Sequence, residues 1–378
     1  MAAVFWVSLL LVIHPYVTYP LMLRAWRVFG SRPVRRDAAF EPAVTVLVPA
    51  YNEADVIATT LQALVVQDYP PERLQIIVVS DHSDDGTDDI VRTFAERGVE
   101  LLRQPERGGK AVALNSAVRH ASGDIIVFCD ANARFDPDCV RQLAQNFADP
   151  DVGYATARLI IEAGSSSTSG GGAYQRFEEW LRTAETEVAS VIGVNGGCDA
   201  IRRELYSDIP RELITDFVLP LRVIAAGKRV VFDPHAQSRE TSNTELKAEF
   251  SMRVRVALRA MQGMMHMRGL LNPLRYPSPS ICLFSHKVLR YMAFIFLATA
   301  LASNAALAID STFYRVMLGL HLGCYALAGG GLAQGVRDRL GVLVAAPSYL
   351  LMTYWAFAIA SWRFLRGQSM ATWKPRGG

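Results

Sequence analysis

Four long stretches without a charged residue limit most strongly how this chain can fold. They are residues 1–23, 291–309, 316–336 and 340–362. Each is close to the ~20 apolar residues that an α-helix needs to cross a bilayer. Nearly all of the charge lies between the first two stretches. The sequence therefore predicts an integral membrane protein with one large polar domain set between membrane segments.

The residues beside the first stretch indicate an orientation. No basic stretch precedes it and no small-residue cleavage site follows it, so we expect an uncleaved anchor and not a secretory signal. The segment that follows, residues 24–36, contains five arginines. Positive charge is retained on the inner side of a membrane. We therefore expect a multi-pass protein of the inner (plasma) membrane whose polar domain is cytoplasmic.

Five segments follow from this pattern. They are an N-terminal transmembrane helix (1–23), a cytoplasmic domain (24–250), amphipathic interfacial helices (251–290), C-terminal transmembrane helices (291–366) and a tail (367–378). The interfacial segment is basic and rich in Met and Leu, although packing on the domain core remains an alternative for its first half. Stretch 316–336 is the weakest candidate, so the number of C-terminal crossings and the side of the C-terminus stay open.

The formal net charge of +3 is small, and the arginines gather near the membrane flanks. This distribution favours lipid head groups over nucleic acid as a partner. It indicates no oligomeric state.

Alternating strand and helix patterns begin at Val44. Apolar runs that end in polar residues predict strands over 43–53, 74–81, 99–104 and 124–132, with helical periodicity between them. A further strand is expected over 229–234. This alternation predicts an α/β domain with a doubly wound sheet. Ligands of such sheets bind beyond the carboxyl ends of the strands. Glu53, Asp81 and Asp130 all lie at predicted strand ends.

Five short motifs in a fixed order resemble one family. They read VPAYNE (48–53), SDHSDDGT (80–87), GGKAVALN (108–115), CDAN (129–132) and TDFVLPLR (215–222). Together they resemble the membrane-embedded branch of the family 2 inverting glycosyltransferases, which includes cellulose, chitin, hyaluronan and poly-N-acetylglucosamine synthases. The resemblance covers roughly residues 44–260. It implies a GT-A type mixed sheet between transmembrane helices, a UDP-sugar donor and a saccharide or lipid-linked acceptor.

The resemblance implies a nucleotide-sugar site at the strand ends. Ala50, Tyr51 and Glu53 would line the pocket for the base and ribose, and Asp81 would accept hydrogen bonds from uracil. Capping of the following helix is the alternative role for Asp81. Further members of the site would be Lys110, Asn115, Asp130 and Arg255. Lys110 follows two glycines at a helix start, where a phosphate can bind, and Asn115 would be a positioning residue.

Asp130 and Asn132 are two residues apart, so both side chains can point to one side of an extended segment. A divalent ion bound through diphosphate oxygens needs few protein ligands, and an amide oxygen is an acceptable one. We therefore expect Mg²⁺ or Mn²⁺ here. A turn closed by these two side chains is the alternative.

Inversion requires a group that removes the proton of the acceptor hydroxyl. Asp216, a lone acid in an apolar run, takes this catalytic role in the resemblance, and an N-cap is its alternative role. Acceptor contacts would come from Gly196, Gly197, Cys198 and Asp199.

The sequence thus predicts a membrane enzyme, a hexosyl- or N-acetylhexosaminyltransferase, that transfers a sugar with inversion at the cytoplasmic face; coupling to export stays open. Polymerising relatives carry Gln-x-x-Arg-Trp where this chain has Met252, Arg255 and Val256, so long-chain synthesis is in doubt. The alternative is a catalytically inactive nucleotide-binding membrane regulator, which the weak second metal ligand would fit.

Overall fold

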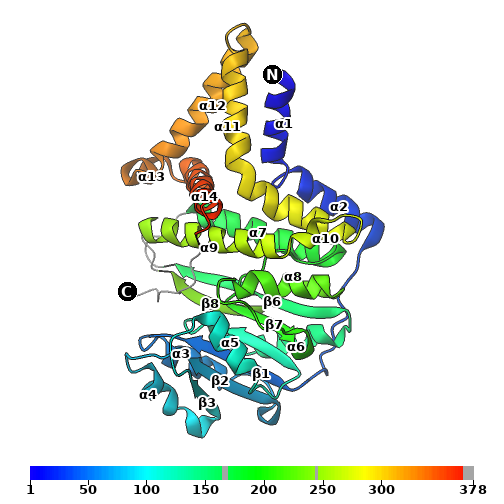
Figure 1. The fold of residues 1–378 in the computed structure, drawn as a ribbon, viewed down its shortest axis with the longest axis vertical. Helices are drawn as coiled ribbons and strands as arrows, with labels where there is room; N and C mark the ends of the chain where they lie inside the picture. The colour runs from blue at the N-terminus through cyan, green and yellow to red at the C-terminus, as the bar shows by residue number, and fades with distance from the viewer. Residues whose placement is uncertain (164–168, 243–245, 369–378) are drawn as a thin grey trace.

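A computed structural model describes residues 1–163, 169–242 and 246–368. The molecule is elongated, with a bundle of apolar helices at one end and an α/β domain at the other (Figure 1). Helices α2, α7, α9 and α10 lie between these two parts, beneath the bundle and above the sheet.

One eight-stranded mixed sheet forms the domain, in the order β3-β2-β1-β4-β7-β6-β8-β5. The strands β1 to β4 are parallel to one another, whereas β7 is antiparallel to β4 and β6, and β5 is antiparallel to β8. Their bounds are β1 Val44–Ala50, β2 Leu74–Ser80, β3 Val99–Arg103, β4 Ile125–Cys129, β5 Arg134–Phe135, β6 Val152–Ala163, β7 Cys198–Arg202 and β8 Arg229–Ser242. The mixed sheet predicted from the sequence is confirmed, including its first four strands.

The second half of the sheet was largely missed. β6 and β7 were not predicted, and β8 continues to Ser242, well past the strand expected over 229–234. β6 pairs with β8 in parallel over most of its length. Such pairing between residues 76 to 79 positions apart leaves no short-range signal, because strand stability depends on cross-strand neighbours.

Helices cover both faces of the sheet, and each face has its own hydrophobic core. One core includes Leu114 and Leu219, and the other includes Leu61 and Leu143. The helices concerned are α5 Lys110–Val118, α7 Ser169–Val188 and α8 Thr215–Ala225 on the first face, and α3 Ile57–Leu64, α4 Thr87–Arg92 and α6 Cys139–Gln145 on the second. Short 3-10 turns occur at Pro71–Arg73, Ala95–Arg97, Asn146–Ala148, Arg203–Leu205 and Arg268–Leu271.

The N-terminal apolar stretch is two helices and not the single expected one. α1 Ala2–Ile13 and α2 Thr18–Gly30 meet at an angle of 60°. The break contains Pro15, which has no backbone N–H with which to continue the hydrogen bonds of a helix. The pair is long and apolar enough to cross a membrane only when it is counted as one bent span.

At the C-terminal end, two helices of the described chain pass the same test of length and composition. One runs from Pro277 to Leu307 and consists of α10 Pro277–Leu283, a π-helical turn (Phe284–Val288) and α11 Leu289–Leu307. The other is Leu343–Leu365, within α14 Val342–Leu365. The stretch 316–336 lies in α12 Thr312–Gly330 and α13 Gln334–Leu340 and does not pass.

The segment 251–290 therefore differs from the expected set of interfacial helices, because its last residues already belong to the first of these long helices. Its first part belongs to α9 Leu246–His266. There Val254, Ala257 and Leu258 are buried against α14. These contacts join the segment to the apolar helix α14, so the choice between an interfacial helix and packing on the domain core stays a prediction.

Candidate active site

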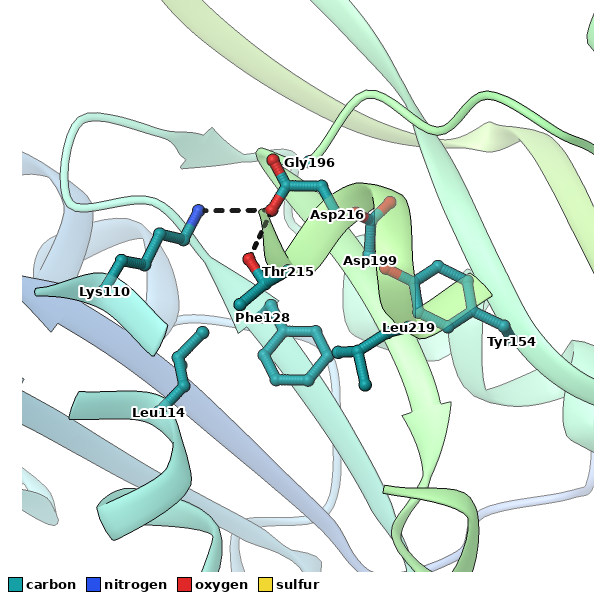
Figure 2. Close-up of a pocket in the computed structure, with 9 residues that line it drawn as sticks. All are labelled: Lys110, Leu114, Phe128, Tyr154, Gly196, Asp199, Thr215, Asp216 and Leu219. Atoms are coloured by element: carbon teal, nitrogen blue, oxygen red, sulfur yellow. Dashed lines mark hydrogen bonds and ion pairs between the residues drawn. The ribbon is translucent and has the colours of Figure 1, made fainter. Parts of the chain in front are cut away.

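A small pocket lies where the parallel and antiparallel halves of the sheet meet. Its walls come from α5, β4, β6, β7 and α8 (Figure 2). The lining residues are Lys110, Leu114, Phe128, Tyr154, Gly196, Asp199, Thr215, Asp216 and Leu219. Three of the predicted site residues that carry charge, Lys110, Asp199 and Asp216, thus meet in one place although they are far apart in the sequence.

Lys110 connects the two acids predicted to act on opposite sides of the reaction. Its Nζ atom lies 2.6 Å from Asp130 Oδ1 and 3.8 Å from Asp216 Oδ1. Lys110 is the first residue of α5, and Gly109 before it has a φ of 90°, a conformation that favours glycine. Burial alone would lower the pKa of Lys110, but Asp130 and Asp216 outweigh that effect and raise it. We call Lys110, Asp130 and Asp216 the site triad.

Asp216 lies in the first turn of α8, one residue after Thr215 begins the helix, and the N-cap is Ile214. The alternative N-cap role for Asp216 is therefore wrong. The Thr215 hydroxyl donates to Asp216 Oδ1 over 2.6 Å. Gly196 packs so closely that a Cβ atom there would overlap the Asp216 carboxylate, and its φ is +86°. Position 196, predicted to contact the acceptor, must therefore be glycine so that the carboxylate of Asp216, the predicted base, fits beside it.

Asp199 projects from β7 into the same pocket and is 1% exposed. Burial and the nearby Asp216 raise its pKa to about 7, although Thr156, Tyr154 and Lys110 act in the opposite direction. Figure 2 shows the Asp199 carboxyl beside the Tyr154 ring, while Asp216 is directed toward Lys110.

Cys198 has a different environment from its neighbour. Successive side chains of a strand point to opposite faces, so Cys198 leaves the pocket and its sulfur lies 3.5 Å from the Cys139 sulfur. Both thiols are free. Gly197 faces another buried acid, because a Cβ atom there would overlap Glu240 on β8. Gly196 and Asp199 therefore line the pocket, while the predicted acceptor residue Cys198 belongs to the core on the other face.

The Asp81 carboxylate binds a loop of the protein itself. Its two oxygens accept hydrogen bonds from the backbone N–H groups of Gly108 and Gly109, each over 2.7 Å. The following helix, α4, is capped at Gly86, so the alternative capping role is wrong. Asp81 thereby holds the loop that presents Lys110. A base that bound to Asp81 would share its carboxylate with these amides.

The predicted nucleotide-binding strand end lies beside Asp81. The carbonyl of Ala50 accepts from the Asp81 N–H over 2.8 Å. The Arg107 guanidinium lies 3.7 Å from the centre of the Tyr51 ring. The backbone N–H of Glu53 donates to the Thr87 hydroxyl. The residues 50–53 are thus packed against the loops around Asp81 and Arg107, at the carboxyl ends of β1 and β2.

Asn115 and Arg255, which were predicted to bind the donor, are not among the residues that line the pocket. Asn115 accepts from the Tyr206 hydroxyl and the Ile209 N–H, and its amide donates to the Ile209 carbonyl. Its side chain therefore fastens the loop before α8, and its positioning role toward the donor stays a prediction. Arg255 lies on α9, one turn before Arg259, which donates to the Leu213 carbonyl next to the start of α8.

Asp130 and Asn132, the two predicted metal ligands, lie in the turn that follows β4. The turn is closed by the backbone, since Ala133 N–H donates to the Asp130 carbonyl. Among the described residues, no group of three or more His, Cys, Asp or Glu side chains could hold a metal ion. Two oxygen ligands suit a cation that takes its remaining ligands from phosphates. The corner therefore fits a divalent ion only together with a phosphate ligand, and such an ion would share Asp130 with Lys110.

Sequence reasoning missed several residues of the site. Phe128 and Leu219 supply apolar walls, and Thr215 supports Asp216. Tyr154, Thr156 and Glu240 come from β6 and β8, whose pairing no local pattern revealed. Only Thr215 carried a signal, because it stands next to Asp216 within a recognised motif.

Comparisons with known proteins find similarity to glycosyltransferases. Residues 45–209 match the model of the family described as Glycosyl transferase family 2. The probable glycosyltransferase YdaM of Bacillus subtilis is 30% identical over 258 residues, which is 64% of this chain and 59% of that protein. Poly-beta-1,6-N-acetyl-D-glucosamine synthase of Staphylococcus aureus is 26% identical over 243 residues, which is 58% of each chain. The chain thus spans little more than half the length of these relatives.

A solved structure resembles almost the whole chain. It is the mannosyltransferase PcManGT from Pyrobaculum calidifontis in complex with GDP-Man and Mn²⁺. The two share 25% identity with a TM-score of 0.75, over 97% of this chain and 99% of that one. The fold is therefore a GT-A-like mixed α/β domain joined to apolar helices that could span a membrane.

Proposed function

We propose that this protein transfers a sugar from a UDP-sugar to a hydroxyl acceptor with inversion of the anomeric carbon. The observation that carries the proposal is the site triad. Lys110 holds the predicted diphosphate corner, Asp130, and the predicted base, Asp216, within reach of one pocket. A single-displacement transferase needs a leaving-group site on one side of the anomeric carbon and a base on the other. The triad supplies both.

The donor would bind along the carboxyl ends of β1, β2 and β4. Tyr51 and Asp81 line the end assigned to the base, and Asp130 with Asn132 would hold Mg²⁺ or Mn²⁺ on the diphosphate. Bound there, the ion would neutralise charge that develops on the leaving nucleoside diphosphate. The similar mannosyltransferase structure holds GDP-Man and Mn²⁺, whereas the named relatives include an N-acetylglucosamine polymer synthase. A hexose or an N-acetylhexosamine fits both.

Asp216 would accept the proton of the attacking hydroxyl. Its position supports this role, since Thr215 fixes one carboxylate oxygen and Gly196 leaves room beside the other. The attacking oxygen then displaces the diphosphate directly, so the product has the opposite anomeric configuration.

Reaction at a membrane surface follows from the apolar helices. We infer that the helix Pro277–Leu307 and α14 cross the inner membrane, and that the bent pair α1 and α2 forms a further anchor. The arginines in residues 24–36 would then hold the catalytic domain on the cytoplasmic side. An acceptor that is part of a lipid-linked saccharide or a growing polysaccharide would approach from the layer of helices above the sheet.

The test is release of nucleotide by the purified chain in lipid nanodiscs. UDP-glucose, UDP-N-acetylglucosamine and GDP-mannose would each be supplied with Mn²⁺, with and without EDTA. We expect one donor to be turned over, and Asp216→Asn to lower the rate at least ~10³-fold. Asp208→Asn, an exposed carboxylate outside the pocket, is the matched control. If UDP binds by calorimetry but no donor is consumed, the chain is a nucleotide-binding regulator and the transferase proposal fails.

A further inference from the structure

A lysine ammonium group lies against a backbone loop where the apolar helices meet the α/β domain. Lys287 belongs to the π-helical turn Phe284–Val288 of the helix Pro277–Leu307. Its Nζ atom lies against Gly193, in the loop between α7 and β7, at the place that a Cβ atom of residue 193 would take. Among the residues that the structure describes, none accepts a hydrogen bond from this ammonium or forms an ion pair with it. Charged groups away from bulk water are normally paired, so this one marks a place for an anion.

The charged side chains around Lys287 carry an excess of positive charge. The groups that act most strongly on its ammonium are two acids and two arginines, Glu178, Glu185, Arg182 and Arg290. Glu178 forms an ion pair with Arg290. Even if His286, which lies between the two acids, is neutral, three cations face two carboxylates. One positive charge in this group is therefore unbalanced.

Arg182 approaches the same loop from α7, which lies in the layer between the sheet and the helix bundle (Figure 1). Its Nε atom donates to the Gly193 carbonyl over 2.8 Å, and the residue is 8% exposed. Glu179, one turn earlier on α7, pairs with Arg158 and not with Arg182. Within the described part of the chain, no carboxylate pairs with Arg182. Lys287 and Arg182 thus bring two cations to one residue of the loop.

The position of Lys287 along its helix matches the head-group region of a membrane. The helix Pro277–Leu307 has 31 residues, which at 1.5 Å per residue makes a length of about 46 Å. The hydrocarbon core of a bilayer is about 30 Å thick, and the charge-free stretch of the chain begins at residue 291. With this stretch inside the core, Lys287 lies just outside it. Basic pockets beside membrane helices on the cytoplasmic side are places where lipid head groups bind.

The two cations are separate from the pocket, and a ligand can reach one of them. Lys287 is half-buried, so part of its side chain is open. Neither Lys287 nor Arg182 lines the pocket around Asp216. A free phosphate ion would give up its water for two cations only. A lipid is already held at high local concentration beside the helix by its acyl chains, so the phosphate of a membrane lipid is the anion that fits best.

We propose that Lys287 and Arg182 bind the phosphate of an anionic phospholipid at the junction between the apolar helices and the α/β domain. This inference rests on the membrane location in the proposed function and not on the proposed reaction. The ammonium donates to the phosphate oxygens, and the guanidinium adds a second charged donor. A lipid with a net negative charge is preferred to a zwitterionic one, because it balances the extra positive charge. The lipid is a bound ligand and not the sugar acceptor.

The experiment measures lipid binding and requires no turnover. The full chain in detergent would be mixed with phosphatidylglycerol or phosphatidylcholine. Native mass spectrometry counts the lipid that stays bound, and the shift of the unfolding midpoint gives its affinity. We expect phosphatidylglycerol to bind more tightly, and Lys287→Met to weaken its binding about tenfold or more, as loss of a charge-assisted hydrogen bond predicts. Each variant is compared with itself in phosphatidylcholine, so a change in the stability of the fold cancels, and Lys287→Gln is the second variant if Lys287→Met does not fold.

Arg275→Met is the matched control. Arg275 is an exposed arginine just before the same helix, so this variant removes the same charge without touching Lys287. It should leave the preference for phosphatidylglycerol unchanged. Equal losses in Lys287→Met and Arg275→Met would overturn the inference, since diffuse surface charge would then explain the binding.

Other anions identify the source of the phosphate. The inference is overturned if inorganic phosphate alone gives the same shift, or if equimolar farnesyl phosphate displaces phosphatidylglycerol, because the anion would then be a free ion or a lipid-linked acceptor. Extraction of the native chain from membranes by alkaline carbonate would overturn both this inference and the proposed membrane location. A chain that stays in the membrane but binds the two phospholipids equally overturns the inference alone. If phosphatidylglycerol binds through Lys287 and no donor is ever consumed, the lipid site stands and the transferase proposal fails.

Discussion

Two clusters of charged side chains illustrate how one chain uses buried charge in two ways. The site triad lies in the pocket, and its side chains are 23% to 32% exposed. The second cluster joins α7 to the long helix Pro277–Leu307 and is at most 9% exposed. It consists of Glu178, Glu185, His286 and Arg290, and we call it the anchor cluster.

The anchor cluster is enclosed by its own partners. Glu185 accepts from the Tyr19 hydroxyl and lies 2.7 Å from His286 Nδ1. Glu178 pairs with Arg290 and lies 3.2 Å from His286 Nε2. Three aromatic rings lie next to the Arg290 guanidinium, those of Tyr174 and Phe177 on α7 and of Tyr16 in the break between α1 and α2. Its members come from α7 and the helix Pro277–Leu307, and Tyr19 adds a partner from α2, so the cluster fixes the α/β domain to the apolar helices.

The two clusters differ in whether a charged side chain that loses its partner can find another one. In the site triad each carboxylate is partly solvated, so an incoming cation or hydroxyl can replace the ammonium group at modest cost. In the anchor cluster no solvent can replace a lost partner, and the remaining charge would stay buried. We therefore expect substitutions in the anchor cluster to act on stability, and substitutions in the site triad to act on catalysis.

The largest effect should follow removal of Glu178. Glu178→Ala leaves Arg290 buried without its carboxylate, and loss of one partner from a buried pair costs about 3–5 kcal/mol. Thermal unfolding of the detergent-solubilised protein, followed by fluorescence, should show a midpoint lower by several degrees. The matched control is Glu187→Ala on the same helix, because Glu187 pairs with the exposed Arg27 and such pairs contribute about 0–1 kcal/mol. Equal shifts in the two variants would contradict a role for the anchor cluster.

Lys110→Met should lower activity and leave the stability of the fold nearly unchanged, the reverse of what we expect for Glu178→Ala. It removes the cation between Asp130 and Asp216, so we expect nucleotide release to fall about 10²–10³-fold, as for other losses of an electrostatic contact in an active site. The unfolding midpoint should stay close to that of Lys228→Met, whose ammonium group lies outside the pocket. A large loss of stability with unchanged turnover of the remaining folded protein would show that the triad is structural.

Sequence patterns predicted the site triad but not the anchor cluster, and the reason is physical. Asp130 follows a strand of five buried residues, and Asp216 opens an apolar helix, so each carries a local signal. His286 and Glu185 are 101 residues apart, and the π-helical turn that presents His286 has no recognisable pattern. β6, and Thr156 within it, could not be predicted for the same reason, because the strand pairs with segments far away in the sequence. The break at Pro15, in contrast, could have been read directly from the sequence.

A pH dependence should distinguish Asp199 from the exposed acids. The folded-state pKa of Asp199 is about 7, above its ordinary value of 3.8. The folded protein therefore holds more protons than the unfolded chain between these values, and the free energy of unfolding falls as pH rises through this window. Above pH ~7 the residue's contribution is constant.

Asp199→Asn removes this dependence. We expect the unfolding midpoint of the variant to rise relative to that of the native protein as pH increases from about 4 to about 7. Above that pH the difference between the two midpoints should stay constant. Melting curves at matched ionic strength measure it, and Asp208→Asn on the surface is the control. A difference that grew as pH fell would contradict a buried acid that favours its protonated form.

The smallest effect should come from Thr215→Ala. This variant tests only the hydrogen bond that holds Asp216, the proposed base. The variant removes the hydroxyl that donates to Asp216 Oδ1. A hydrogen bond to a charged group contributes about 1.5–3 kcal/mol. Thr215 is buried, but the Asp216 carboxylate is partly exposed, so water can replace part of the lost hydrogen bond and we expect only about a tenfold fall in kcat. Thr215→Ser keeps the donor and should recover most of the rate. If Thr215→Ala and Thr215→Ser lower kcat equally, the methyl packing of Thr215 and not its hydrogen bond positions Asp216. The unfolding midpoint should not change in either variant, because neither leaves a charge without solvent or a partner.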